Sequence, residues 1–176
     1  MVVIGAWLIN SLVFRSFSVT GPSMQTTMHT GARLIVNRLP MTWNAIIGRS
    51  YQPQRGHVIV FQNPRYAEMR HDQFIVKRVI GLTGDRVVIR NGTITVYNPE
   101  HPNGFDPYDT IDIEPSDVTG LVDRTVGEGQ IFVIGDNRGG EESMDSRNGL
   151  GTVPLKNVVG PVSLRIYPLD KISSDF

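Results

Sequence analysis

Ser23 is the first side chain in the sequence whose setting suits chemistry, because it directly follows Gly21-Pro22. Glycine permits positive φ and proline restricts φ, so the pair forces a turn that presents the serine hydroxyl at a bend. A serine hydroxyl becomes a nucleophile only when a neighbouring base takes its proton. Because Gly-Pro-Ser alone is most often an ordinary turn, the question is whether the chain supplies that base.

Histidine is the usual partner of a nucleophilic serine. The chain has four histidines, at His29, His57, His71 and His101. Each stands in a polar, loop-like context without an obviously placed acidic residue, which is typical of exposed loop histidines. A Ser-His-Asp arrangement stays open on sequence alone. The scattered His and Asp residues lack metal-ligand spacing, so the sequence predicts no metal and no other cofactor.

Lys77 is the second candidate base, and it lies in the apolar segment Phe74–Ile80. Strand alternation places it on one face with Ile75 and Val79. If that face is partly buried, desolvation lowers the lysine pKa. A drop of ~2 units from ~10.4 makes the neutral amine abundant, at a cost of roughly 2.7 kcal/mol. The alternative is a lysine that extends its ammonium group into solvent from an edge strand.

A third stretch, Gly135–Gly149, follows the apolar run Ile131–Ile134 and is punctuated by glycine. Its polar residues include Asp136, Arg138, Ser143, Asp145, Ser146 and Arg147. Acidic, basic and hydroxyl groups packed this densely suit a network of charge-assisted hydrogen bonds. The alternative is an ordinary turn with surface ion pairs, which contribute little to stability.

The elements that must position these groups are short strands rich in β-branched and aromatic residues. They are Arg33–Asn37, Val58–Phe61, Phe74–Ile80, Arg86–Arg90, Thr93–Tyr97, Ile131–Ile134 and Val162–Tyr167. Asn91-Gly92 between two of them indicates a hairpin. We expect a mostly β fold, a barrel or sandwich, with no long helix after residue 28. Leu39–His57 and Asn98–Gly129 are predicted to be loops or insertions at its edge.

Length and composition narrow the class of protein. The 176 residues fit one domain, with or without a subdomain. Lysine plus arginine equal aspartate plus glutamate at 17 each. This balance lacks the basic excess of a nucleic-acid-binding protein. The absence of cysteine excludes disulfides, thiolate metal sites and a cysteine nucleophile.

Residues 1–14 form an apolar run that ends before Arg15. As a helix it would span about 21 Å, short of the ~30 Å hydrocarbon core of a bilayer. No basic residue precedes it, so it lacks the first region of a signal peptide. Three interpretations stay open: part of a transmembrane anchor whose start is missing, an interfacial helix with Trp7 and Arg15 near the headgroups, or a buried helix of a soluble domain.

Taken together and in this order, four pieces resemble type I signal peptidases. They are the apolar N-terminal segment, Gly21–Met28, Lys77–Asp85, and Gly135–Arg138 with Ser143–Arg147. The resemblance implies a signal-peptidase-like β core of short, largely antiparallel strands with an N-terminal apolar membrane-associated helix. Residues 1–16 would be the membrane anchor or interfacial segment, and residues 17–176 the catalytic domain.

The resemblance also implies a function, a membrane-bound serine endopeptidase that removes signal peptides from secreted preproteins after small residues of the Ala-x-Ala type. Ser23 would be the nucleophile and Lys77 the general base, with Ser143 orienting the lysine amine. The ion pair of Asp145 and Arg147 would support the site. The small-residue pockets would be lined by Val19, Gly21, Ile75 and Val76. Partners would be preproteins and membrane lipid but no nucleic acid, with the domain on the extracytoplasmic face of the cell membrane.

The sequence departs from the family pattern at several positions. Thr26 and Met28 stand where proline and leucine are common, and Thr83 replaces a usual proline. Gly21 stands where some members carry a serine that completes the oxyanion hole. Two other interpretations remain, a soluble Ser-Lys self-cleaving protease of the repressor type and a non-catalytic membrane-tethered β module.

Overall fold

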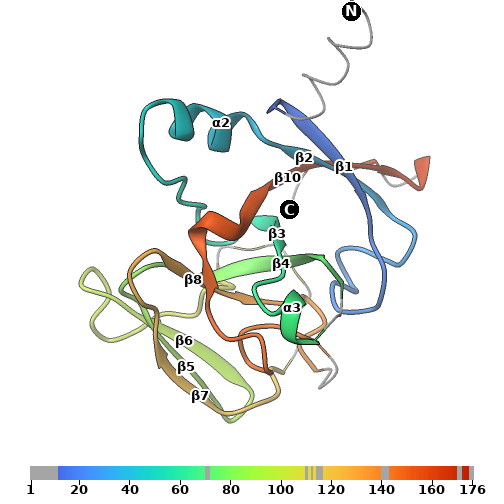
Figure 1. The fold of residues 1–176 in the computed structure, drawn as a ribbon. Helices are drawn as coiled ribbons and strands as arrows, with labels where there is room; N and C mark the ends of the chain where they lie inside the picture. Colours follow the sequence, from blue (N-terminus) through green and yellow to red (C-terminus); the bar gives the residue numbers. More distant parts are fainter. Residues whose placement is uncertain are drawn as a thin grey trace, which may run out of the picture.

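The computed structural model describes residues 12–69, 72–109, 111, 113, 117–139, 143–169 and 172–174 (Figure 1). The strands are β1 (Phe14–Ser18), β2 (Arg33–Asn37), β3 (Val58–Gln62), β4 (Phe74–Gly81), β5 (Arg86–Arg90), β6 (Thr93–Tyr97), β7 (Val122–Thr125), β8 (Gln130–Ile134), β9 (Val153–Pro154) and β10 (Val158–Tyr167). The helices are α2 (Leu39–Ile46), α3 (Tyr66–Met69) and the 3-10 turn η1 (Leu155–Asn157). The described chain is therefore mostly β.

Two antiparallel sheets make up the fold. The larger sheet has the strand order β1-β2-β10-β3-β4-β8-β9, and the smaller has the order β6-β5-β7. The ten-residue β10 pairs with β3 through its first half and with β2 through its second half. It thereby connects β1 and β2, which precede and follow the Ser23 turn, to β3 and β4, the second of which contains Lys77.

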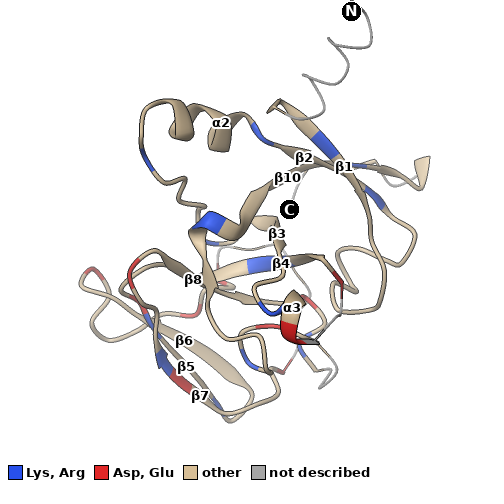
Figure 2. Cartoon of the chain, in the orientation of Figure 1, with Lys and Arg blue, Asp and Glu red and all other residues tan. Residues whose placement is uncertain are grey.

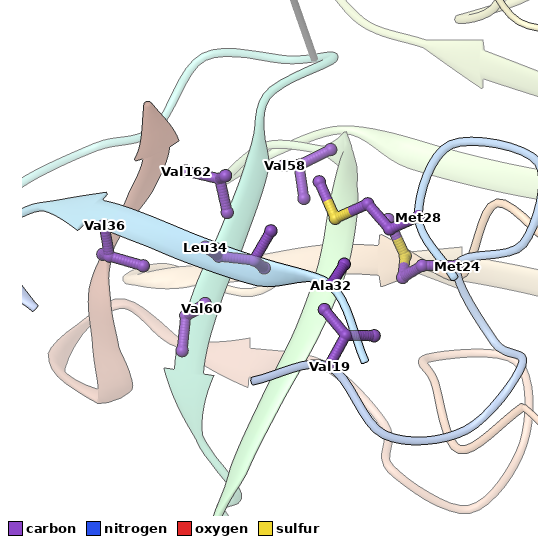
Figure 3. Packing of buried hydrophobic residues seen from close by; sticks show 9 residues of the cluster. All are labelled: Val19, Met24, Met28, Ala32, Leu34, Val36, Val58, Val60 and Val162. Atoms are coloured by element: carbon purple, nitrogen blue, oxygen red, sulfur yellow. The ribbon is translucent and has the colours of Figure 1, made fainter. Parts of the chain in front are cut away.

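The turn that contains Ser23 is held by its own apolar side chains. Met24 and Met28 are fully buried and pack in one cluster with Val19, Ala32 and Val58. Figure 3 shows the two methionines lying together beside Val58 at the end of this cluster. Burial of each large side chain stabilises the turn by about 1.5–3 kcal/mol. The turn is therefore anchored in the core on either side of its exposed tip.

Both faces of β4 are covered. Ile75 and Val79 belong to a cluster with Ile59 and Phe61 of β3, whereas Ile80 packs against the smaller sheet. The alternation predicted for this strand agrees with this division. Lys77 shares the Ile75 and Val79 face, so its aliphatic stem emerges among apolar side chains and it is only 3% exposed.

The structure corrects one predicted loop and adds three strands. Leu39–Ile46, within the predicted loop Leu39–His57, is helix α2, with Pro40 in its first turn where the missing N–H is not needed. Its eight residues are too few to show a helical period in the sequence. β1, β7 and β9 were not expected as strands, and β7 lies inside the predicted loop Asn98–Gly129.

Residues 1–11 of the predicted N-terminal helix lie outside the described residues, and residues 14–16, which were assigned to the same anchor or interfacial segment, belong to strand β1. Within the described residues, no helix is both long and apolar enough to cross a membrane.

Candidate active site

Lys77 and Ser23, which are 54 residues apart in the sequence, meet in the structure. Lys77 Nζ lies 2.6 Å from Ser23 Oγ. This is hydrogen-bonding distance for a general base and its nucleophile. Ser23 is half-buried and Lys77 is buried, so the pair lies at the boundary between core and solvent.

Burial changes the acidity of the lysine. Desolvation lowers the pKa of Lys77 from 10.5 to about 8, against the attraction of Asp145, Asp136 and Asp72 for its ammonium form. The guanidinium of Arg147 lowers this pKa further by repulsion. A neutral amine is consequently available near neutral pH, and only the neutral form can accept a proton from serine.

The residues after β8 pack directly on the backbone of the nucleophile. The backbone N–H of Asn137 donates to Ser23 O at 3.1 Å, and its side-chain amide donates to Pro22 O at 3.3 Å. A Cβ at Gly135 would lie 2.3 Å from Ser23 O and 2.8 Å from Ser143 Oγ. Real Cβ atoms do not approach that closely, so only glycine fits at Gly135 and the Ser23 backbone is fixed against this strand end.

The predicted polar network of the Gly135–Gly149 loop is present and buried, and Asp145 is its centre. Asp145 forms an ion pair with Arg147 at 2.8 Å, and both side chains are inaccessible to solvent. Asp145 also accepts hydrogen bonds from the Ser143 hydroxyl at 2.8 Å and the Gly135 N–H at 3.1 Å. Arg147 in turn donates to the Arg138 carbonyl oxygen at 2.6 Å. These bonds hold Ser143 and Gly135 against the nucleophile.

A second buried ion pair joins the two halves of the site. Arg78, next to Lys77 on β4, donates two hydrogen bonds of 2.8 Å to Asp136. Asp136 Oδ2 also accepts a hydrogen bond of 2.6 Å from Thr27, which lies in the turn after Ser23. The lysine strand and the serine turn are therefore tied together through one carboxylate.

An open cleft of about 540 Å³ leads to the pair. Val19, Gly21, Ile75 and Val76, the predicted pocket residues, all line it. Phe17, Phe74 and Met144 also contribute, and the rings of Phe17 and Phe74 are 5.2 Å apart. β8 pairs with β4 only from Arg78 onward. Among the described residues, the Phe74–Lys77 edge of β4 that faces the cleft has no strand paired to it.

The contacts of Ser143 and of the histidines were also considered from the sequence. Within the described residues Lys77 Nζ bonds Ser23 and the Ser143 hydroxyl donates to Asp145, and the hydrogen bond expected between Ser143 and Lys77 is absent. His29, His57 and His101 do not hydrogen-bond Ser23 in the described residues, and His71 lies outside them. In the part of the chain that is described, no group of three His, Asp or Glu side chains is arranged to hold a metal ion.

Sequence reasoning missed the roles of Gly135, Thr27 and Asn137. In the sequence, Gly135 stands directly after an apolar strand and before Asp136. A glycine at the end of a strand often marks a point where another backbone approaches closely, and this could have indicated its role. Thr27 and Asn137 gave no signal, since their contacts are to residues more than 100 positions away.

Comparison with known proteins gives a consistent result. The family model described as signal peptidase, peptidase S26, matches residues 1–167. The chain is 33% identical over 172 residues to signal peptidase I P of Bacillus subtilis subsp. natto, covering 94% of this chain and 84% of that protein. It is 35% identical over 173 residues to signal peptidase I of Bacillus caldolyticus, covering 93% and 85%.

A solved signal peptidase I from Enterococcus faecalis V583 is 29% identical, with a TM-score of 0.45, covering 62% of this chain and 95% of that one. The family match over residues 1–167 and the similarity of the two Bacillus relatives lead to one conclusion. The chain belongs to the signal peptidase family, peptidase S26, and is an enzyme of the signal peptidase I type.

Proposed function

We propose that this enzyme is a membrane-bound serine endopeptidase that removes signal peptides from secreted preproteins, with Ser23 as nucleophile and Lys77 as general base. The observation that carries the proposal is the 2.6 Å separation of Lys77 Nζ and Ser23 Oγ. It is supported by the burial that lowers the pKa of the same amine to about 8. Either feature alone would be compatible with a structural role, but together they describe an activated nucleophile.

The acylation step follows from this geometry. Neutral Lys77 accepts the Ser23 proton while Ser23 Oγ attacks the scissile carbonyl carbon. The resulting oxyanion is stabilised by the Ser23 N–H, which has no acceptor among the described residues. One such donor is typically worth about 10²–10³ in rate. Lys77 then protonates the leaving amine, and afterwards it activates the water that releases the acyl group.

The supporting role in this proposal belongs to three residues that position the reacting groups: Ser143, Asp145 and Arg147. Asp145 accepts hydrogen bonds from the Ser143 hydroxyl and the Gly135 N–H, which keeps Gly135 beside the Ser23 carbonyl oxygen. Asp145 and Arg147 act on the Lys77 pKa in opposite directions. Desolvation is the main cause of the lowered pKa of Lys77, and the buried ion pair adjusts it.

Substrate binding uses the cleft and the edge of β4. A preprotein segment in extended conformation adds along Phe74–Val76, where backbone hydrogen bonds tolerate varied side chains. Val19, Gly21, Ile75 and Val76 form pockets that accept small residues such as alanine, which gives the Ala-x-Ala preference. The apolar residues 1–14 attach the enzyme to the cell membrane as a single anchor. The domain then lies on the extracytoplasmic face, where preproteins emerge.

The test is cleavage of a preprotein and of an Ala-x-Ala peptide in detergent by the full chain and its Ser23→Ala and Lys77→Met variants. We expect both variants to lose cleavage while their circular dichroism stays that of the parent. Lys156→Met, at an exposed lysine that does not line the cleft, is the matched control and retains activity. Full activity in either dyad variant would contradict the assignment. Cleavage confined to the enzyme's own chain would favour a self-cleaving protease.

A further inference from the structure

The cleft lies along the unpaired edge of β4 and is lined from both faces of the larger sheet. On the first face, Val76 packs against the cluster that contains Val19 and Val60, two residues that Figure 3 shows in that cluster. On the second face, Ile75 packs against the cluster that contains Phe61. Val19, Val60, Ile75 and Val76 all line the cleft, so a ligand at this edge meets apolar side chains on either side of the sheet.

Met144 adds a second apolar side chain to the face of Ile75. It lines the cleft and packs against the same cluster as Ile75. Its neighbours in the chain, Ser143 and Asp145, are 4% and 0% exposed and are joined by a hydrogen bond of 2.8 Å. Met144 itself is only partly buried. Its backbone is therefore held on both sides while its side chain borders the cleft.

A peptide that adds to β4 as a strand presents alternate residues to the two faces of the sheet. The residues one and three positions before the scissile bond share a face, and the residue between them points to the other. In the proposed function the two small residues occupy pockets that Val19 and Val76 line, which belong to the first face. The middle residue then points to the second face, toward Met144.

The surroundings of that middle residue are largely uncharged. In Figure 2 β4 is tan apart from a blue segment, which is Lys77 and Arg78, so Phe74–Val76 carries no charge. Both basic side chains are buried, at 3% and 1% exposed. Asp72 is exposed in the cleft and disfavours an acidic residue. Methionine is unbranched and polarisable, so it adapts to apolar side chains of different shapes.

We infer that Met144, with Ile75 beside it, forms an apolar subsite for the residue between the two small ones. The inference rests on the proposed function and adds a substrate class to it. Among preproteins with small residues at both positions, the enzyme prefers those with leucine, methionine or phenylalanine between them over those with serine or aspartate. Met144 is thus a specificity-determining residue, and it takes no part in the chemistry of the dyad.

Two peptides that differ only in the middle residue, Ala-Leu-Ala and Ala-Ser-Ala, test this with the full chain in detergent. We expect kcat/KM to be about tenfold higher for the leucine peptide, from partial burial of its side chain. The difference should appear in KM, because the contact is the same before and during the chemical step. Met144→Gln should reduce the ratio to about twofold, and Met144→Leu should restore it.

A methionine outside the cleft supplies the matched control. Met41 of α2 is also partly buried and does not line the cleft, so Met41→Gln should leave the ratio at its parent value. Equal kcat/KM for the two peptides in the parent chain would overturn the inference. An undiminished ratio in Met144→Gln would also overturn it, whether or not the overall rate falls, because the detergent or a different part of the cleft would then be the source of the preference.

Peptide binding without turnover separates this inference from the proposed function. The Ser23→Ala chain should bind the leucine peptide with a Kd about tenfold lower than the serine peptide, as measured by fluorescence anisotropy. That result with no cleavage of either peptide by the parent chain would refute the proposed function alone. Cleavage of both peptides at equal rates, with equal Kd values, would refute the subsite alone.

Discussion

Protonation of Lys77 is the perturbation that tests the mechanism most directly, and pH controls it. With the pKa of Lys77 lowered to about 8, the neutral fraction falls about tenfold for each pH unit below that value. If the neutral amine is the base, kcat/KM at pH 6 should be about 100-fold below its alkaline plateau. With a fully solvated lysine as the base, the rate would already begin to fall below pH ~10.4.

The lowered pKa of Lys77 also makes the stability of the fold depend on pH. A fall from 10.5 to about 8 corresponds to about 3 kcal/mol of preference for the neutral form. Because the pKa is lower in the folded state, the unfolded chain binds more protons between pH 8 and pH 10.5. Stability should therefore rise with pH through this window, by up to about 3 kcal/mol. Lys77→Met should remove that rise.

Both effects can be measured with standard assays. Initial rates on a fluorogenic Ala-x-Ala peptide in detergent give kcat/KM against pH, and urea unfolding at several pH values gives stability. Circular dichroism of the Ser23→Ala chain across the same range separates loss of fold from loss of rate. A rate limb near pH ~6.5 would indicate a histidine base instead. A profile flat down to pH ~5 would refute any lysine base.

Two further substitutions test how the site is held. Gly135→Ala puts a methyl group against Ser23 O, so we expect about 1–3 kcal/mol lower stability. A displacement of the nucleophile by ~1 Å should lower kcat/KM by about 100-fold. Asp136→Asn leaves the buried Arg78 charge without its partner, and urea denaturation should show a loss of about 3–5 kcal/mol.

Each of these substitutions has a control elsewhere in the chain. Gly139→Ala should change neither rate nor stability, since a Cβ there meets nothing within 4 Å. Asp123→Asn removes the exposed partner of Arg86 and should have little effect on unfolding. Equal losses in a substitution and its control would contradict the argument from close contact and burial.

The sequence was most informative where the pattern is local. Alternation in Phe74–Ile80 placed Lys77 on an apolar face, and the density of charges after Ile134 indicated a network; the structure has both. The strands expected at Arg33–Asn37, Arg86–Arg90 and Thr93–Tyr97 have the predicted bounds. Such features depend on residues within a few positions of each other, which a single sequence displays.

What the sequence did not show depends on tertiary contact. Nothing near Thr27 indicates that its hydroxyl bonds to Asp136, 109 residues away. The Ser143 hydroxyl donates to the charged carboxylate of Asp145 at 2.8 Å, and which partner it finds depends on how the loop folds, which the sequence does not show. α2 escaped notice because its eight residues cover little more than two helical turns, too few to show a helical period.

β1 acts as a spacer of fixed length. It begins at Phe14 and ends at Ser18, next to Phe17, the first residue in the chain that lines the cleft. Five strand residues span about 17 Å, and β1 is rigidly paired with β2 along its whole length. If the anchor proposed for residues 1–14 ends at the bilayer surface, the scissile bond must reach about that height. A signal peptide would then need roughly five extended residues between its apolar core and its cleavage site, and peptides with a shorter stretch would escape processing.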